Sequence, residues 1–377
     1  MACCRARPKR AIPAPDSYVP KVQHEPSHRF DATADLIRQA VEQKAFPAAV
    51  IEVGDPTRVL WRHAFGHLYA GSDAPETLDD TVFDLASLTK VLATTAIAMQ
   101  QVERGGLGLD DPVGHHTSAW TGADRLSVTV RDLLAHCGGL TAHIPFFRTL
   151  EGATAFEQAI CQSALAYAPR SASVYSDLGF MLLGFMLGRE VAIEDRFVAL
   201  QTQMGVVEDL QFNPPSIWRS RIAPTEFDAW RGRLLVGEVH DENAAALKGA
   251  AGHSGLFGTA AAVGQHARHV LQILAGRGGV FQRSTVETFV ARRADVPGSS
   301  RALGWDTMLP TSSCGRRMSA RAFGHTGFTG TSLWIDPDRE IYVVFLTNRV
   351  HPSRENEAIR LVRPAVHDAV MDALESN

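Results

Sequence analysis

The chain has 377 residues, of which 45% are hydrophobic and 21% are charged. This composition indicates a globular protein with a real core and about two domains, and it argues against a disordered chain. The 37 Lys and Arg residues against 41 Asp and Glu give a net charge of −4. No overall basic field is therefore available to recruit nucleic acid or a membrane surface.

The cysteines are few, odd in number and without metal-ligand spacing, so we expect free thiols in a reducing compartment and neither a metal nor a cofactor. They are Cys3, Cys4, Cys137, Cys161 and Cys314. Residues 1–24 are basic and contain prolines but no apolar run, which is typical of a flexible tail. As written, the chain is expected to be cytoplasmic. A misassigned start would instead make it periplasmic or secreted.

Secondary structure can be predicted most clearly near the two ends of the chain. A helix is expected over about residues 30–45, ended by Pro47, and is followed by a hairpin of strands 48–53 and 58–66. A second hairpin is expected from strands 331–335 and 340–347, and a last helix from about 356 to 374.

Residues from Ser87 to about Met204 have mainly helical patterns, and their longest apolar stretch, from Leu178 to Gly188, is too short to span a bilayer. Strands at both ends with helices between them predict an α/β (α+β) fold. Its antiparallel sheet would be flanked by the N- and C-terminal helices and interrupted by an all-helical domain. We assign residues 25–86 and 205–377 to the sheet domain and 87–204 to the helical domain, with an active site at their interface.

Ser87 and Lys90 are the first candidates for catalysis. They lie three residues apart at the start of a nearly all-apolar helix, so both side chains share one face. A lysine can deprotonate a serine only if burial and nearby positive charge depress its pKa toward neutrality. The alternative is an ordinary helix start with a solvent-facing lysine.

Tyr175 and Asp177 are candidates in the loop that opens the next apolar helix. A phenol there can relay protons to and from a serine and its leaving group. The alternative is a capping sequence in which Ser176 or Asp177 is the N-cap and Tyr175 a hydrophobic staple.

The glycine-rich stretch 323–330, just before the second hairpin, carries His325, Thr326, Gly327 and Phe328. Small residues allow a substrate to lie along a strand edge where main-chain N–H groups face an oxyanion. His325 would supply a polar or cationic contact, and a protonated His325 would bind an anionic substrate less well as the pH rises through about 6.5. The alternative is a glycine-rich turn with an incidental histidine.

In this order, Ser-x-x-Lys at 87–90, Tyr-Ser-x at 175–177 and His-Thr-Gly at 325–327 resemble the motifs of the serine β-lactamase and penicillin-binding DD-peptidase superfamily. The chain resembles most its class C-like branch of β-lactamases, carboxypeptidases and esterases. Segments 130–140 and 252–259 are also similar to that branch. Segments 239–244 and 347–352 resemble signatures of esterase-like members, and no physical role can be given to them from sequence.

The resemblance implies a β-lactamase/transpeptidase-like fold and an acyl-enzyme formed on Ser87, with Lys90 and Tyr175 sharing the acid–base work. It also implies an oxyanion hole made by the backbone N–H groups of Ser87 and Phe328. Substrate would be oriented by four further residues: Asp177, His325, Thr326 and Gly327.

Two departures bear on the substrate, which is expected to be a small ester, amide or peptide. Asp177 stands where many members have Asn, which adds negative charge near the cleft. His325 stands where typical β-lactamases have Lys, so a permanent anchor for a substrate carboxylate is missing. We therefore place esterase-type activity ahead of D-amino-acid peptidase (DD-carboxypeptidase) activity, and weak β-lactamase activity third. A non-catalytic penicillin- or peptidoglycan-binding sensor is a further alternative. The sequence does not define the oligomeric state.

Segment 252–255 (Gly-His-Ser-Gly) superficially resembles the nucleophile elbow of α/β-hydrolases. Leu256 stands where that motif needs Gly, so this interpretation is rejected.

Overall fold

The computed structural model describes residues 28–376. The flexible tail expected over residues 1–24, together with Cys3 and Cys4, lies outside this range. The helices are α1 (Asp31–Glu42), α2 (Ala96–Glu103), α3 (Val113–His116), α4 (Val130–Leu134), α5 (Gly152–Gln162), α6 (Asp177–Leu187), α7 (Ile193–Met204), α8 (Glu242–Ala246), α9 (Ala260–Leu274), α10 (Arg283–Val290) and α11 (Ile359–Glu375). Shorter helical turns are His28–Phe30, Phe146–Arg148 and Ser216–Arg221, and Lys90–Thr95 is a π-helical turn.

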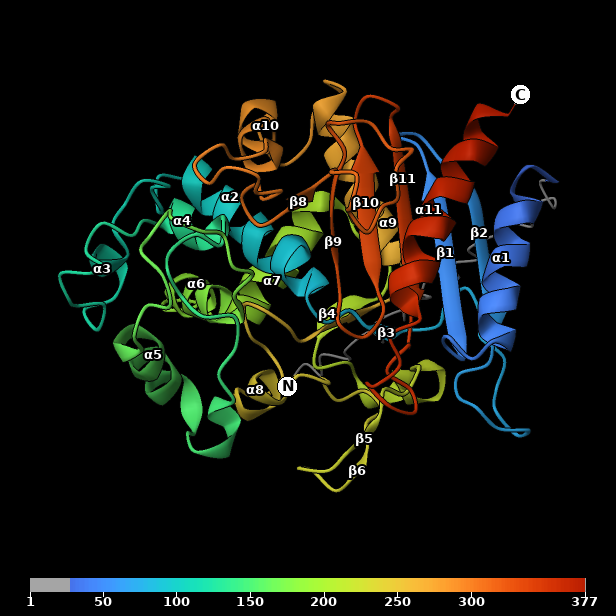
Figure 1. Ribbon diagram of the computed structural model, residues 1–377, viewed down its shortest axis with the longest axis horizontal. Coiled ribbons are helices and arrows are strands. Elements are labelled where there is room, and N and C mark those ends of the chain that lie inside the picture. The colour runs from blue at the N-terminus through green and yellow to red at the C-terminus, as the bar shows by residue number, and fades with distance from the viewer. Residues whose placement is uncertain (1–27, 377) are drawn as a thin grey trace, which may run out of the picture.

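The strands are β1 (Ala48–Gly54), β2 (Val59–Gly66), β3 (Phe83–Asp84), β4 (Leu210–Phe212), β5 (Phe227–Asp228), β6 (Arg233–Leu234), β7 (Leu256–Gly258), β8 (Asp306–Thr307), β9 (Phe323–Thr326), β10 (Ser332–Asp336) and β11 (Ile341–Thr347). Six of them form one antiparallel sheet in the order β2-β1-β11-β10-β9-β8, so the two ends of the chain meet at its centre (Figure 1). Strands β3, β7 and β4 form a second, small sheet.

Alternate side chains of the central strands fill two different cores. On β1, Ala49, Ile51 and Val53 pack toward α1 and α11, which lie together on one face of the sheet (Figure 1). Ala48 and Val50 face the other way, toward α9 and the helical part of the chain. Because both faces are covered, β1 and β11 are buried along their whole lengths.

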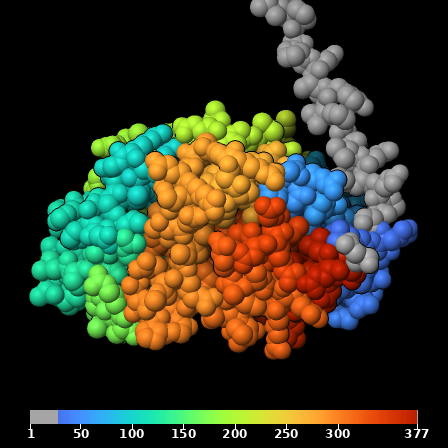
Figure 2. Space-filling view, turned by 90° about the horizontal axis from the view of Figure 1, so that it is seen from above, coloured from blue at the N-terminus to red at the C-terminus, as the bar shows by residue number. Residues whose placement is uncertain are grey.

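Between residues 87 and 204 the structure contains helices and loops and no strand, and this helical part forms the end of the molecule opposite α1 and α11 (Figures 1 and 2). The predicted fold class, an antiparallel sheet built from both chain ends with helices inserted, is confirmed. The boundaries drawn between the two domains stay a prediction.

Two elements differ from their predicted form. The first helix ends at Glu42, before Pro47, because the backbone turns away at Lys44 (φ 61°) and carries Ala45 and Phe46 into the core. The helix after Ser87 is π-helical from Lys90 to Thr95. In this turn Thr94 donates a hydrogen bond to the carbonyl of Gly252 (2.6 Å).

Candidate active site

Ser87 lies on a sharp turn between β3 and the helix that follows. Ala86 has a positive φ of 47°, which costs energy for a residue other than glycine. The buried Asp84 holds this turn, because its Oδ1 accepts the N–H of Ala86 at 2.8 Å. The carbonyl of Ala86 accepts the N–H of Thr89 (3.0 Å). Since the trans peptide directs its N–H opposite to its carbonyl, the Ser87 N–H points out of the helix start.

Lys90 is fully buried and uses all three of its N–H donors. Its Nζ donates to Ser87 Oγ at 3.0 Å, to Asp177 Oδ1 at 2.7 Å and to the carbonyl of His253 at 3.1 Å. Segment 252–255, which superficially resembles a nucleophile elbow, therefore provides a backbone hydrogen-bond acceptor for Lys90. A solvent-facing Lys90 is excluded.

The charge of Asp177 decides the protonation state of this pair. Burial alone lowers the pKa of Lys90, but the Asp177 carboxylate outweighs it and holds that pKa above its ordinary value. Burial likewise raises the pKa of Asp177, and the Lys90 ammonium outweighs it and brings the pKa below its usual range. The condition set from sequence for Lys90 to act alone as the base, a pKa depressed toward neutrality, is therefore not met in the resting protein, because its nearest charge is negative.

Tyr175 presents an uncommitted hydroxyl to the site. Its ring centroid lies 4.8 Å from Lys90 Nζ and 5.6 Å from the centroid of His325. The hydroxyl is buried and has no hydrogen-bond partner among residues 28–376. Burial raises the pKa of Tyr175 although the Lys90 charge opposes this, so the phenol is neutral and can donate its proton.

The loop that carries Tyr175 is held by His136, which lies in segment 130–140 and was not among the site residues proposed from sequence. The Nδ1 of His136 accepts the N–H of Ser176 (3.1 Å), and its carbonyl accepts the N–H of Val174 (3.0 Å). Ser176 is also the N-cap of α6, since its Oγ accepts the N–H of Gly179. The capping interpretation is thus correct for Ser176, while Tyr175 faces the site.

His325 is a buried, neutral histidine on β9. Its Nδ1 lies 2.8 Å from the carbonyl of Thr326, which can only accept, so Nδ1 carries the proton. Burial, then the charges of Lys90 and Arg301, lower the pKa of His325 to about 3. The idea that a protonated His325 anchors an anion near neutral pH is therefore wrong. What His325 offers is an acceptor, because its Nε2 has no partner in the described part of the chain.

The turn after β9 brings a second N–H group to Ser87. At Gly327 a Cβ atom would overlap Thr331 Oγ1 and the Leu85 carbonyl oxygen, so the close approach of these loops requires glycine. The Gly327 carbonyl accepts the N–H of Gly330 (3.0 Å), which directs the Phe328 N–H the opposite way. Within residues 28–376 no acceptor takes the N–H of either Ser87 or Phe328. Two free donors beside a serine are the arrangement that an oxyanion hole needs.

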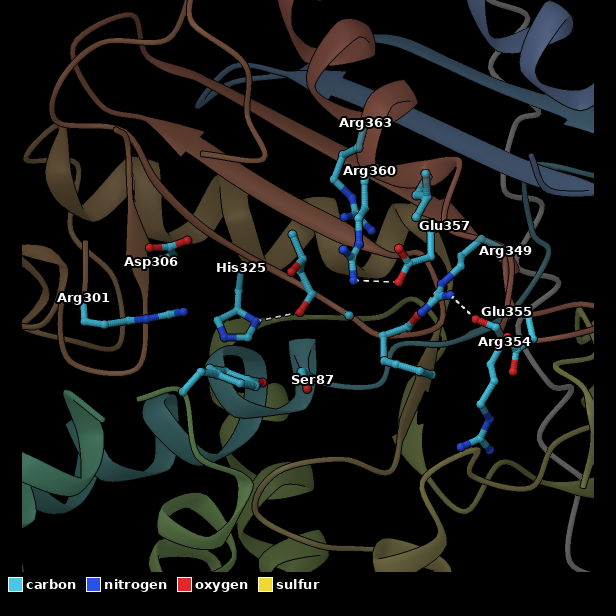
Figure 3. A pocket seen from close by; sticks show the side chains of 15 residues that line it. Ser87, Arg301, Asp306, His325, Arg349, Arg354, Glu355, Glu357, Arg360 and Arg363 are labelled. Carbon is cyan, nitrogen blue, oxygen red and sulfur yellow. Dashed lines mark hydrogen bonds and ion pairs between the residues drawn. The ribbon is translucent and has the colours of Figure 1, made fainter. Parts of the chain in front are cut away.

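Ser87 opens into a cavity of about 540 Å³ (Figure 3). Of the eight residues proposed from sequence, six line it, and Lys90 and Asp177 stand behind Ser87. Sequence reasoning did not place the other, charged residues of the lining at the site: Arg301, Asp306, Arg349, Arg354, Glu355, Glu357, Arg360 and Arg363. The large excess of arginine over lysine was a sequence signal for the arginines alone, and only Arg349 lies in a segment, 347–352, that had been singled out.

Arg301 is the cavity arginine that lies over the ring of Tyr175. Its guanidinium lies 5.1 Å from the Tyr175 ring centroid and points toward His325 (Figure 3). It forms no ion pair with any residue in the range 28–376, whereas Arg360 pairs with Glu357 and Arg354 with Glu226. An unneutralised cation therefore lies beside the reacting groups.

Over residues 28–376, no group of three or more His, Cys, Asp or Glu side chains is placed to hold a metal ion. The helices in this range include none that is both long and apolar enough to cross a membrane.

A fold in which a Ser-Lys-Tyr cluster lies where an antiparallel sheet meets a helical region defines a serine hydrolase. The sequence profile of the Beta-lactamase family matches residues 33–367, and the chain belongs to that family. The superfamily and the enzyme class expected from the motifs are both confirmed.

Two curated relatives and one solved structure illustrate the range of the family. N-acetylmuramyl-L-alanine amidase of Bacillus subtilis is 29% identical over 351 residues, which cover 81% of this chain and 78% of the relative. A putative D-alanyl-D-alanine carboxypeptidase of Salmonella gallinarum is 30% identical and covers 74% of this chain and 72% of its own. The structure of EstCE1, a hydrolase with promiscuous acyltransferase activity, is 22% identical, with a TM-score of 0.71 over 91% of this chain and 98% of that one.

Proposed function

We propose that the protein hydrolyses small carboxylic esters or amides through an acyl-enzyme on Ser87. The observation that carries this proposal is the hydrogen-bonded row Ser87 Oγ, Lys90 Nζ and Asp177 Oδ1, with steps of 3.0 and 2.7 Å. A serine hydroxyl attacks a carbonyl only when its proton has a place to go.

The proton of Ser87 is received by the Lys90–Asp177 pair as a unit. In the resting state the pair is an ammonium and a carboxylate. As Ser87 attacks, its proton moves onto Lys90 while Lys90 passes one of its own to Asp177. The pair then carries one positive charge, which balances the negative charge that develops on the carbonyl oxygen. The N–H groups of Ser87 and Phe328 hold that oxygen.

Tyr175 completes the cycle by donating its proton to the leaving oxygen or nitrogen as the bond to the carbonyl carbon breaks. It regains a proton from Lys90. A water molecule then attacks the acyl-enzyme, its proton follows the same route, and Ser87 is released in its protonated form.

The test uses the full chain with p-nitrophenyl acetate, a D-Ala-D-Ala peptide and a penicillin, and it follows product and intact mass. We expect turnover of the ester and a transient acyl adduct on Ser87. Ser87→Ala should lose at least about 10³-fold in kcat. Full activity of that variant rejects the mechanism, and a stable penicillin adduct without turnover of any compound supports the sensor instead.

D-amino-acid peptidase activity is the second candidate. Arg301 would supply a permanent positive charge for a substrate carboxylate, which the His-Thr-Gly motif lacks because it has His325 in place of Lys. The names of the curated relatives, an amidase and a putative carboxypeptidase, point the same way. A peptide that ends in a carboxylate can pair with this guanidinium.

We therefore predict that Arg301→Gln lowers kcat/KM for a D-Ala-D-Ala peptide about tenfold or more and leaves that for p-nitrophenyl acetate within about twofold. The matched control is Arg321→Gln, which removes an exposed guanidinium paired with Asp338. An equal loss for both substrates contradicts the anchor.

A further inference from the structure

Phe328 is an exposed aromatic residue whose ring is nevertheless held in place. Half of its surface is open to solvent. The ring of His240 stacks on it, with 5.5 Å between centroids and 26° between planes, and the Arg349 guanidinium lies 4.4 Å from its centroid. His240 and Arg349 belong to segments 239–244 and 347–352, the two motifs to which no role could be given from sequence.

Arg349 also fixes the main chain of Phe328. Its Nε donates to the carbonyl of Phe328 at 2.8 Å, and its Nη1 donates to the carbonyls of Arg354 (2.7 Å) and Asn356 (2.9 Å). No carboxylate within residues 28–376 forms an ion pair with it. The Arg349 guanidinium therefore links the carbonyl of Phe328 to those of two residues in the loop before α11, at the edge of the cavity (Figure 3).

His240 is tied to the turn that carries Ser87. Its backbone N–H donates to Asp84 Oδ2 at 2.6 Å, while Asp84 Oδ1 holds the N–H of Ala86. The ring Nε2 lies 2.8 Å from Glu226 Oε1, and Arg354 binds the same carboxylate. His240 is thus connected to the Ser87 turn through Asp84 and to Phe328 through its ring.

We propose that Arg349 and His240 are positioning residues that hold the Phe328 N–H in line with the Ser87 N–H before substrate arrives. The proposal rests on the proposed function, which gives these two donors the oxyanion. The peptide units on either side of Phe328 are each fixed through their carbonyls, one by the N–H of Gly330 and the other by Arg349. Donors that are already aligned need no reorganisation as charge develops.

The first test is Arg349→Met, measured with p-nitrophenyl acetate and with an arylboronic acid. Boron accepts the Ser87 oxygen, the serine proton moves to the Lys90–Asp177 pair, and a boron-bound oxygen takes the oxyanion position. We expect kcat to fall about 10- to 100-fold with KM within about twofold, and boronic acid affinity to fall by the same factor as kcat. Arg349→Lys keeps the positive charge but lacks the planar guanidinium that donates from several nitrogens, so it should restore little of this loss.

The matched control is Arg321→Met, whose kcat should equal that of the wild type. An Arg349→Met variant with unchanged kcat, or with a change in KM alone, overturns the proposal. A wild type that shows no adduct on Ser87 instead overturns the proposed function, so the two failures are distinguishable.

The second test does not depend on Arg349→Met folding. His240 contacts the Phe328 side chain only through its ring. His240→Ala should therefore lower kcat about fivefold in the wild type and have almost no effect in a Phe328→Ala background, which keeps the N–H but lacks the ring. Equal effects in both backgrounds contradict the proposed action through Phe328.

Discussion

The chemistry of this site depends at the residue scale on one carboxylate. Asp177 lies 2.7 Å from the Lys90 ammonium, and its other oxygen lies 3.8 Å from His143. Lys90 is fully buried and only 20% of the Asp177 side chain is exposed, so the attraction between their charges is strong enough to reverse the effect of burial on both pKa values. An amide in this place would leave the buried charge of Lys90 with neutral partners only: the amide oxygen, Ser87 Oγ and the carbonyl of His253.

Asp177→Asn is therefore expected to change the pH–rate profile. In the wild type the pair needs an ionised Asp177, whose pKa is lowered, so the acid limb should lie below the ordinary aspartate value of about 3.9. Without the carboxylate, burial lowers the pKa of Lys90, and activity should require the neutral amine. We expect a loss of at least about 10²-fold at pH 7 and an acid limb moved upward by several pH units.

The control for this profile is Asp241→Asn, which removes a nearby carboxylate that pairs with His253 (2.9 Å) and not with Lys90. The position of its acid limb should match the wild type. An Asp177→Asn variant with an unmoved acid limb would show that Asp177 only orients substrate, which is the role the family resemblance implied for it.

The sequence was sufficient to predict which residues form the site, but not whether Lys90 and His325 are charged. The spacing of Ser87 and Lys90 fixes a shared helix face, and the family resemblance brings in Tyr175 and His325. The charge state of Lys90 depends on Asp177, 87 positions away, and on a backbone carbonyl at His253. The neutral state of His325 depends on burial, which no short motif records.

At the scale of elements, the start of α6 links stability to catalysis. Ser176 caps this helix with its Oγ and also donates to the carbonyl of Thr141 at 2.7 Å. Its neighbours on either side are the two site residues Tyr175 and Asp177. A change in the cap should therefore reach both the helix and the reacting groups.

Ser176→Ala is expected to lower the free energy of unfolding by about 1–2 kcal/mol and kcat about tenfold. The matched variant is Thr259→Ala, which removes the N-cap of α9, where the Thr259 side chain accepts the N–H of Ala262. It should lose similar stability and keep its kcat. Denaturant unfolding and ester turnover measure both effects, and an unchanged kcat in Ser176→Ala would mean that Tyr175 is held by His136 alone.

Most elements could be predicted because each carries its own signal. Apolar periodicity marked α1 and α11, and alternation with turn residues marked the two hairpins. The π-helical turn Lys90–Thr95 could not be predicted, since its side chains donate hydrogen bonds to the carbonyls of the distant residues Gly252 and His253. The Arg349–Phe328 contact was likewise invisible, because it depends on where two loops from different parts of the chain meet.

At the scale of the whole molecule, the site lies where the sheet meets the helical part, and one hydrophobic core extends through both. The larger hydrophobic cluster contains residues of β1 and β11 together with residues of α2, α6 and α7. The residues that line the cavity at Ser87 come mainly from the loop before α6, from β9 and the turn after it, and from the segment between β11 and the start of α11. The sheet and the helical part therefore share a hydrophobic core, and residues from both parts surround Ser87.

We expect this shared core to give a single unfolding transition that a ligand of Ser87 shifts as a whole. An arylboronic acid present at 100 times its Kd should add about 2.7 kcal/mol to the free energy of unfolding, because it binds only the folded site. Calorimetry of the wild type should show one peak that moves upward with the ligand, and Ser87→Ala should show the same peak without the shift. Two peaks, of which the ligand moves only one, would instead mean that the sheet and the helical part unfold independently and that their common core contributes little cooperativity.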